Sequence, residues 1–151
     1  LFVLFQIFLG ALVAGLDAGL TYTTWPLMDG DFIPPVAKLF IQTPWYQNLG
    51  ENPLTVQFIH RMGAYALLGF ALWHAWRMRR IADDPRDAKM ATALVIAVLL
   101  QALIGIITLL TQVEMEWALI HQFWAFVILV VTVLHWARLN GHGLVEEHQP
   151  A

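Results

Sequence analysis

Cysteine is absent from the 151 residues of this chain, which excludes disulfides, iron–sulfur clusters and thiol chemistry within it. Charge is also scarce, because 13% of the residues are charged, about half the share usual in a soluble domain. Hydrophobic residues make up 59%, including seven Trp and nine Phe. This composition indicates an integral membrane protein. The formal net charge of -3 is uninformative for a surface that mostly faces lipid, and we expect no nucleic-acid partner.

Long uncharged stretches predict four membrane-spanning helices, at about residues 1–20, 53–76, 90–113 and 117–138. The connection at residues 21–52 is polar and rich in Pro and Trp, which suits an interfacial loop, with a short helix at 36–42. The predicted fold is therefore all-α, an integral membrane four-helix antiparallel bundle over residues 1–139 with a long interfacial loop between its first two helices. Residues 140–151 are predicted to form a polar, solvated C-terminal tail.

The ends of the chain and its basic residues indicate context and orientation. The chain opens inside an apolar run without Met, so we interpret it as a fragment, or one half, of a longer polypeptide. Five of its eight basic residues lie between the second and third predicted helices: Arg77, Arg79, Arg80, Arg86 and Lys89. By the positive-inside rule, this loop and the C-terminus face the cytoplasm or an equivalent compartment. The long interfacial loop then faces the opposite side.

Two histidines lie just inside the predicted membrane boundary on that opposite side. Pro53 suits the first turn of a helix, and His60 and Arg61 follow about two turns later. His121 occupies a similar position near the start of the fourth helix. Because the second and fourth helices run in the same direction, both imidazoles come to a similar depth. Ionisable groups inside a membrane segment indicate function, so we predict that His60 and His121 are ligands of one buried metal or haem.

A second pair of histidines leaves an alternative open. His74 follows His60 by 14 residues, and His135 follows His121 by 14, which returns each to nearly the same helix face about 21 Å away. One helix pair could therefore hold two stacked haems. We favour the simpler interpretation, in which His74 and His135 lie at the cytoplasmic interface beside the arginine cluster. A zinc site is a weaker hypothesis, because no third ligand stands at a matching helical offset.

Several motifs resemble the haem A synthase family, specifically its C-terminal half. They occur in the expected order over most of the chain, from about residue 10 to 122. These motifs are Ala14-Gly15-Leu16-Asp17-Ala18-Gly19-Leu20, Tyr22, Trp25-Pro26-Leu27-Met28, Gly30, Glu51-Asn52-Pro53, Thr55-Val56-Gln57-Phe58, His60-Arg61, Gly105-Ile106, Thr108-Leu109-Leu110 and His121-Gln122.

The resemblance implies an enzyme made of two pseudo-symmetric four-helix halves, each with a pair of haem-facing histidines. The complete enzyme oxidises a methyl group of haem O to the formyl group of haem A, for use in cytochrome oxidase. The expected location is a bacterial inner (plasma) membrane or the mitochondrial inner membrane. The expected partners are the N-terminal half, which handles haem O and haem A, an unidentified electron donor and the lipid bilayer, with self-association as a further option.

By the same resemblance, His60 and His121 carry over as axial ligands of a haem b, with Arg61 placed to pair with a haem propionate. A glutamate three residues before the first histidine is thought to act in the chemistry of the N-terminal half, and Gln57 stands at that position here. We therefore expect no catalytic residue in this half, which would be structural or relay electrons. The alternatives are a free-standing b-type cytochrome with two bis-histidine haems and a purely structural membrane subunit.

Overall fold

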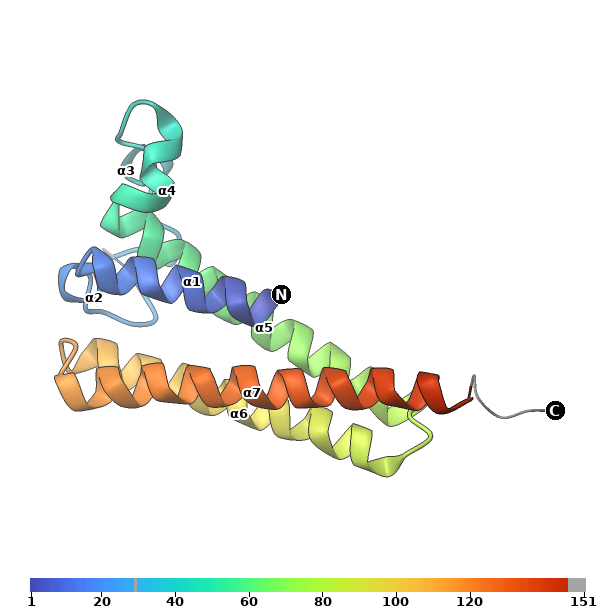
Figure 1. The fold of residues 1–151 in the computed structure, drawn as a ribbon. Coiled ribbons are helices and arrows are strands. Elements are labelled where there is room, and N and C mark those ends of the chain that lie inside the picture. Colours follow the sequence, from blue (N-terminus) through green and yellow to red (C-terminus); the bar gives the residue numbers. More distant parts are fainter. Residues whose placement is uncertain (29, 147–151) are drawn as a thin grey trace.

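The structure, a computed structural model, describes residues 1–28 and 30–146 (Figure 1). Its long helices are α1 (Phe2–Gly15), α5 (Pro53–Ile81), α6 (Pro85–Leu110) and α7 (Met115–Glu146). The short helices are α2 (Ala18–Thr21), α3 (Val36–Leu39), η1 (Trp45–Gln47) and α4 (Asn48–Glu51). Within the described residues the regular elements are all helical, apart from one isolated bridge between Met28 and Asp31. The predicted all-α class is confirmed.

Each of the four long helices packs against its neighbours in the chain. The main contacts join α1 to α5, α5 to α6, α6 to α7, and α7 back to α1, so α5 and α7 face each other diagonally. Figure 1 shows α6 and α7 side by side along their length, and α1 along the N-terminal part of α5. The α6–α7 turn lies at the same end of the molecule as α2. An ideal Cβ on Gly19 of α2 would lie 2.8 Å from Val113 Cγ2 in that turn, which confirms this close approach.

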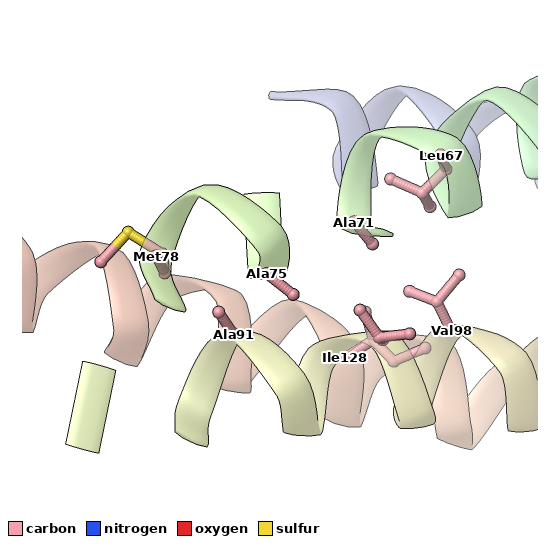
Figure 2. Close-up of a cluster of buried hydrophobic side chains, with 8 residues drawn as sticks. Leu67, Ala71, Ala75, Met78, Ala91, Val98 and Ile128 are labelled. Atoms are coloured by element: carbon pink, nitrogen blue, oxygen red, sulfur yellow. The ribbon is translucent and has the colours of Figure 1, made fainter. Parts of the chain in front are cut away.

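A hydrophobic core fills the space between α5, α6 and α7 (Figure 2). It consists of the buried side chains Leu67, Ala71, Ala75, Met78, Ala91, Val95, Val98 and Ile128. Leu67 lies midway along the sequence between His60 and His74, and Ile128 has the corresponding midway position on α7. The core therefore separates two levels of histidines along these helices.

The membrane character of the chain rests on two helices. Within the described residues, α6 and residues 115–141 of α7 are long and apolar enough to cross a membrane. Only 11% and 6% of the residues in their most apolar windows are buried, so these are not core helices of a soluble domain. Helix α1 is apolar but has only 14 residues. Two candidate spans fit membrane insertion, while the four-span antiparallel bundle stays a prediction.

The boundaries of the first helix and of the long connection differ from those predicted. Helix α1 ends at Gly15 rather than near residue 20, because Asp17 adopts a left-handed φ of 49° before α2 begins. The connection at residues 21–52, predicted as a loop, contains three short helices in addition to the end of α2. The short helix predicted at 36–42 is α3, which stops at Leu39.

Helices α5, α6 and α7 all extend further than predicted at the end of the molecule that carries the basic loop. Helix α5 ends at Ile81 rather than near residue 76. Helix α6 begins at Pro85 rather than near residue 90, because the Asp84 side chain caps it by accepting a hydrogen bond from the Arg86 N–H at 2.8 Å. Helix α7 continues to Glu146, so the prediction that a tail begins at Asn140 is wrong for 140–146. Residues 147–151 and the His142 side chain lie outside the described part of the chain. The solvation of His142 and His148 therefore stays a prediction.

Buried polar side chains tie the long connection to the start of α5. Asn52 caps this helix by accepting from the Leu54 N–H at 3.1 Å, and its amide donates to the carbonyls of Lys38 and Leu39. Asn48 accepts a further bond from Asn52 at 3.2 Å. Asn48 and Asn52 are 0% and 2% exposed, so these hydrogen bonds replace ones to water. The connection is thereby fixed over the end of the molecule that holds His60.

Candidate functional site

His60 is a partly buried side chain of α5 that is held by α1. The Gln6 amide Nε2 lies 3.1 Å from His60 Nδ1 and donates to the His60 backbone carbonyl at 2.8 Å. One turn further along α1, Gly10 faces the imidazole, and an ideal Cβ there would lie 3.2 Å from His60 Cε1. A glycine is therefore needed for α1 to approach the ring this closely.

His121 is held by α6 in a closely similar way. The Gln101 Nε2 lies 3.4 Å from His121 Nε2 and donates to the His121 backbone carbonyl at 3.1 Å. Gly105 faces the ring, and an ideal Cβ there would lie only 2.7 Å from His121 Cε1. His121 Nδ1 is buried and has no hydrogen-bond partner in the described part of the chain. A buried ring nitrogen without a partner is unusual and is available to a ligand.

The two imidazoles come from α5 and α7, two helices that also bring His74 and His135 into contact. Within residues 1–28 and 30–146, no three His, Cys, Asp or Glu side chains gather into a metal site. Two imidazoles suit a metal that brings further ligands of its own, as haem iron does with its macrocycle. The unpaired His121 nitrogen and the glycine at each ring fit a bis-histidine haem better than a bare ion.

Arg61, predicted to pair with a propionate, contacts the long connection in this structure. Its guanidinium donates to the backbone carbonyls of Tyr22 at 3.3 Å, Thr24 at 2.8 Å and Leu27 at 3.3 Å. It also donates to Gln57 Oε1 at 3.2 Å. These four acceptors are neutral, and the ion pairs seen among the described residues do not include Arg61. The propionate role stays a prediction, and an anchoring role is observed beside it.

Gln57, three residues before His60, is directed toward the connection. It is 2% exposed, and its amide donates to the carbonyls of Ala18 and Tyr22, each at 3.0 Å. A carboxylate could not donate these two bonds, so the neutral amide has a structural reason to be here. The four-residue spacing between Gln57 and Arg61 indicates their mutual contact, whereas the bonds of Gln57 to Ala18 and Tyr22 have no local sequence signal.

His74 and His135 bond to each other at the opposite end of α5 and α7. Their Nε2 atoms are 2.9 Å apart, with ring centroids at 5.2 Å and an angle of 73° between the ring planes. A metal between two imidazoles needs a separation of about 4 Å if it is to sit in line, since each bond is about 2 Å. His135 is 3% exposed and His74 is half-buried, and their placement at the membrane interface stays a prediction. Nearby, Arg138 pairs with Asp87 at 2.6 Å and with Asp84.

The helical architecture and the imidazoles of His60 and His121 define the class of protein. It is an all-helical protein of membrane character with a candidate cofactor site formed by two histidines. A sequence profile described as "Cytochrome oxidase assembly protein" (COX15-CtaA) matches residues 1–133. The chain belongs to the COX15-CtaA family, as the motif resemblance predicted.

Its relatives include proteins named heme A synthase. The chain is 52% identical to that of Sinorhizobium medicae (strain WSM419) over 141 residues, which cover 93% of this chain and 38% of the relative. It is 53% identical to that of Rhizobium meliloti (strain 1021) over 138 residues, 91% of this chain and 37% of the relative. The chain thus spans less than two fifths of the length of these relatives. No solved structure shows a significant match to it.

Proposed function

We propose that this chain is the C-terminal half of a haem A synthase and that it holds a haem b between α5 and α7. The names of its relatives and its partial coverage of their length support the first statement. The second statement, that the chain holds a haem b, is supported by the site. His60 and His121 come from opposed helices, and each faces a glycine on a neighbouring helix. The complete enzyme would oxidise the methyl group of haem O to the formyl of haem A.

The residues of this half would bind and orient the haem rather than act on a substrate. His60 and His121 would bind the iron, and the positive charge of Arg61 would pair with a propionate. When bound, a six-coordinate haem supplies electron transfer rather than an open position for oxygen. Gln57 holds the connection, so no residue of the site is assigned a catalytic role. This half is then structural or electron-relaying for the N-terminal half.

The location and partners follow from the same proposal. The enzyme would cross a bacterial inner membrane or the mitochondrial inner membrane, with the His60–His121 end on the non-cytoplasmic side. Its N-terminal half would handle haem O and haem A, and a separate donor would supply electrons. A b-type cytochrome with two haems is the less favoured function, because the 2.9 Å contact between His74 and His135 would have to open.

The test is to replace each proposed ligand in the complete polypeptide and record the optical and spin-state spectra of the bound haem. His60→Ala and His121→Ala are each expected to convert six-coordinate low-spin iron to a five-coordinate form or to lose the haem. His148→Ala, in the polar tail, is the matched control and should keep the wild-type spectrum. An unchanged spectrum in either ligand variant would remove that histidine from the site.

A further inference from the structure

The α1–α5 and α6–α7 helix pairs share a pattern of polar residues. In each pair the first helix carries Gln-x-x-x-Gly, as Gln6 to Gly10 in α1 and Gln101 to Gly105 in α6. The second helix of each pair carries the histidine that this motif faces. The two halves of the site are therefore built on the same local plan.

Both glutamines contact the backbone carbonyl and one ring nitrogen of the histidine that they face, although the ring nitrogen differs. Each amide nitrogen donates to the backbone carbonyl of the facing histidine, at 2.8 Å for Gln6 and 3.1 Å for Gln101. The same nitrogen lies beside a ring nitrogen of that histidine, at 3.1 Å from His60 Nδ1 and 3.4 Å from His121 Nε2. Each glutamine therefore touches both the backbone and the ring of one proposed ligand.

Both glutamines also leave a buried polar atom unpaired. The Oε1 atoms of Gln6 and Gln101 have no hydrogen-bond partner among the described residues. Buried polar atoms in native proteins nearly always have one, so two such oxygens at matching positions call for an explanation. An amide offers both a donor and an acceptor, so it can serve a ring nitrogen that is bare or one that carries a proton.

We propose that Gln6 and Gln101 are positioning residues for the two haem ligands, which makes this inference dependent on the proposed haem site. Each amide holds the ring nitrogen that does not bind iron, and fixes the rotation of the ring against its glycine. Such a partner on the second nitrogen decides which nitrogen is free to coordinate. The nitrogen that binds iron must be bare, so the other ring nitrogen of a neutral imidazole carries the proton. The amide then presents its Oε1, unpaired in this structure, as the acceptor for that N–H, at Nδ1 of His60 and at Nε2 of His121. Nε2 of His60 and Nδ1 of His121 are then left for the iron.

The experiment compares glutamine variants in the complete, haem-loaded enzyme. Gln6→Leu and Gln101→Leu remove the amide, and each is expected to keep low-spin iron while haem affinity falls roughly 10- to 100-fold, as for partners of metal ligands generally. Affinity is measured by haem transfer to apomyoglobin. Gln122→Leu is the matched control, since Gln122 adjoins His121 but is exposed, and it should match the wild type.

Two further variants keep the test decisive if the leucine variants fail to fold. Gln6→Glu and Gln101→Glu have nearly the same shape, but a carboxylate accepts and cannot donate. A carboxylate on the ring N–H makes the ligand more basic, so the midpoint potential of the haem should shift to lower values in both.

A glycine provides an independent probe of Gln6. An ideal Cβ on Gly63 would lie 2.3 Å from Gln6 Oε1, so Gly63→Ala must displace the amide while leaving His60 in place. This variant is expected to lower haem affinity in the same direction as Gln6→Leu.

Wild-type affinity and midpoint potential in the glutamine variants and in Gly63→Ala would overturn the positioning role. The haem site itself would then stand, provided that His60→Ala and His121→Ala still change the spin state. If those two alanine variants also kept the wild-type spectrum, the proposed function would fail first.

Discussion

Helices α5 and α7 carry histidines at two levels, and the two levels differ in what holds each ring. At the end beside the long connection, Gln6 and Gln101 reach in from the flanking helices and hold His60 and His121 separately. At the other end, His74 and His135 bond directly to each other at 2.9 Å. The hydrophobic core around Leu67 lies between the two levels.

This difference shows that helical spacing alone does not make a ligand pair. The 14-residue spacing is the same on both helices, so it returns each histidine to nearly the same face. The neighbouring helices decide the outcome. Near His60 they offer an amide and a glycine, whereas His74 meets the ring of His135 on α7 and stacks on Phe70 of its own helix, with an interplanar angle of 10°. At the first level each ring is held by an amide of a flanking helix, whereas the second level is closed by the mutual hydrogen bond of its two rings.

The largest effect is expected from filling the space beside the His121 ring. In Gly105→Ala the added methyl would lie 2.7 Å from His121 Cε1, so the ring must move, at a cost of about 1–3 kcal/mol and with loss of most haem. Gly10→Ala should have a smaller effect, because the corresponding distance is 3.2 Å. Gly69→Ala is the control, since nothing lies within 4 Å there. Haem content per purified chain is the measurement, and equal loss in all three variants would contradict the account.

A smaller effect is expected from loosening the connection at the His60 end. Asn52→Ala removes the cap of α5 and the amide bonds to Lys38 and Leu39, so the free energy of unfolding should fall by about 1–2 kcal/mol. Thermal unfolding in detergent measures this. Asn140→Ala, at an exposed site on α7, should change stability by less than about 0.5 kcal/mol. Equal effects of the two variants would show that the connection is not anchored through Asn52.

The smallest effect is expected at the closed level. His74→Leu and His135→Leu each leave the other ring without its partner, whereas the double variant removes both polar groups together. The double variant should therefore be more stable than the sum of the single effects predicts, by about 1 kcal/mol. Haem content should stay at the wild-type level in all three. A fall to half of that level would instead favour the two-haem alternative.

The sequence predicted the helical class and the start of α5, because Asn52-Pro53 is a standard capping signal. The same signal occurs at Asp84-Pro85, but the start of α6 was predicted near residue 90. The charged residues that follow Pro85 favoured a loop, whereas the helix begins before the apolar segment. The left-handed φ values of 57° at Gln112 and 59° at Val113 have no local sequence signal. They depend on the packing of the α6–α7 turn against α2.

The sequence predicted His60 and His121 as ligands of one group, and this pairing stays a prediction. It missed their supporting glutamines, although the repeated Gln-x-x-x-Gly spacing is visible in the sequence once the helix pairs are aligned. Contacts such as Gln6 to His60 span 54 positions along the chain, so only the packing of α1 against α5 reveals them. The mutual bond of His74 and His135 depends on packing in the same way.

The central claim is that one haem lies between α5 and α7 at the level of His60 and His121. A cryo-electron microscopy map of the complete enzyme tests it most directly. The account predicts a single macrocycle in this half, with density continuous to both of these imidazoles. Density joined to His74 and His135, or rings of His60 and His121 that share no density, would contradict it.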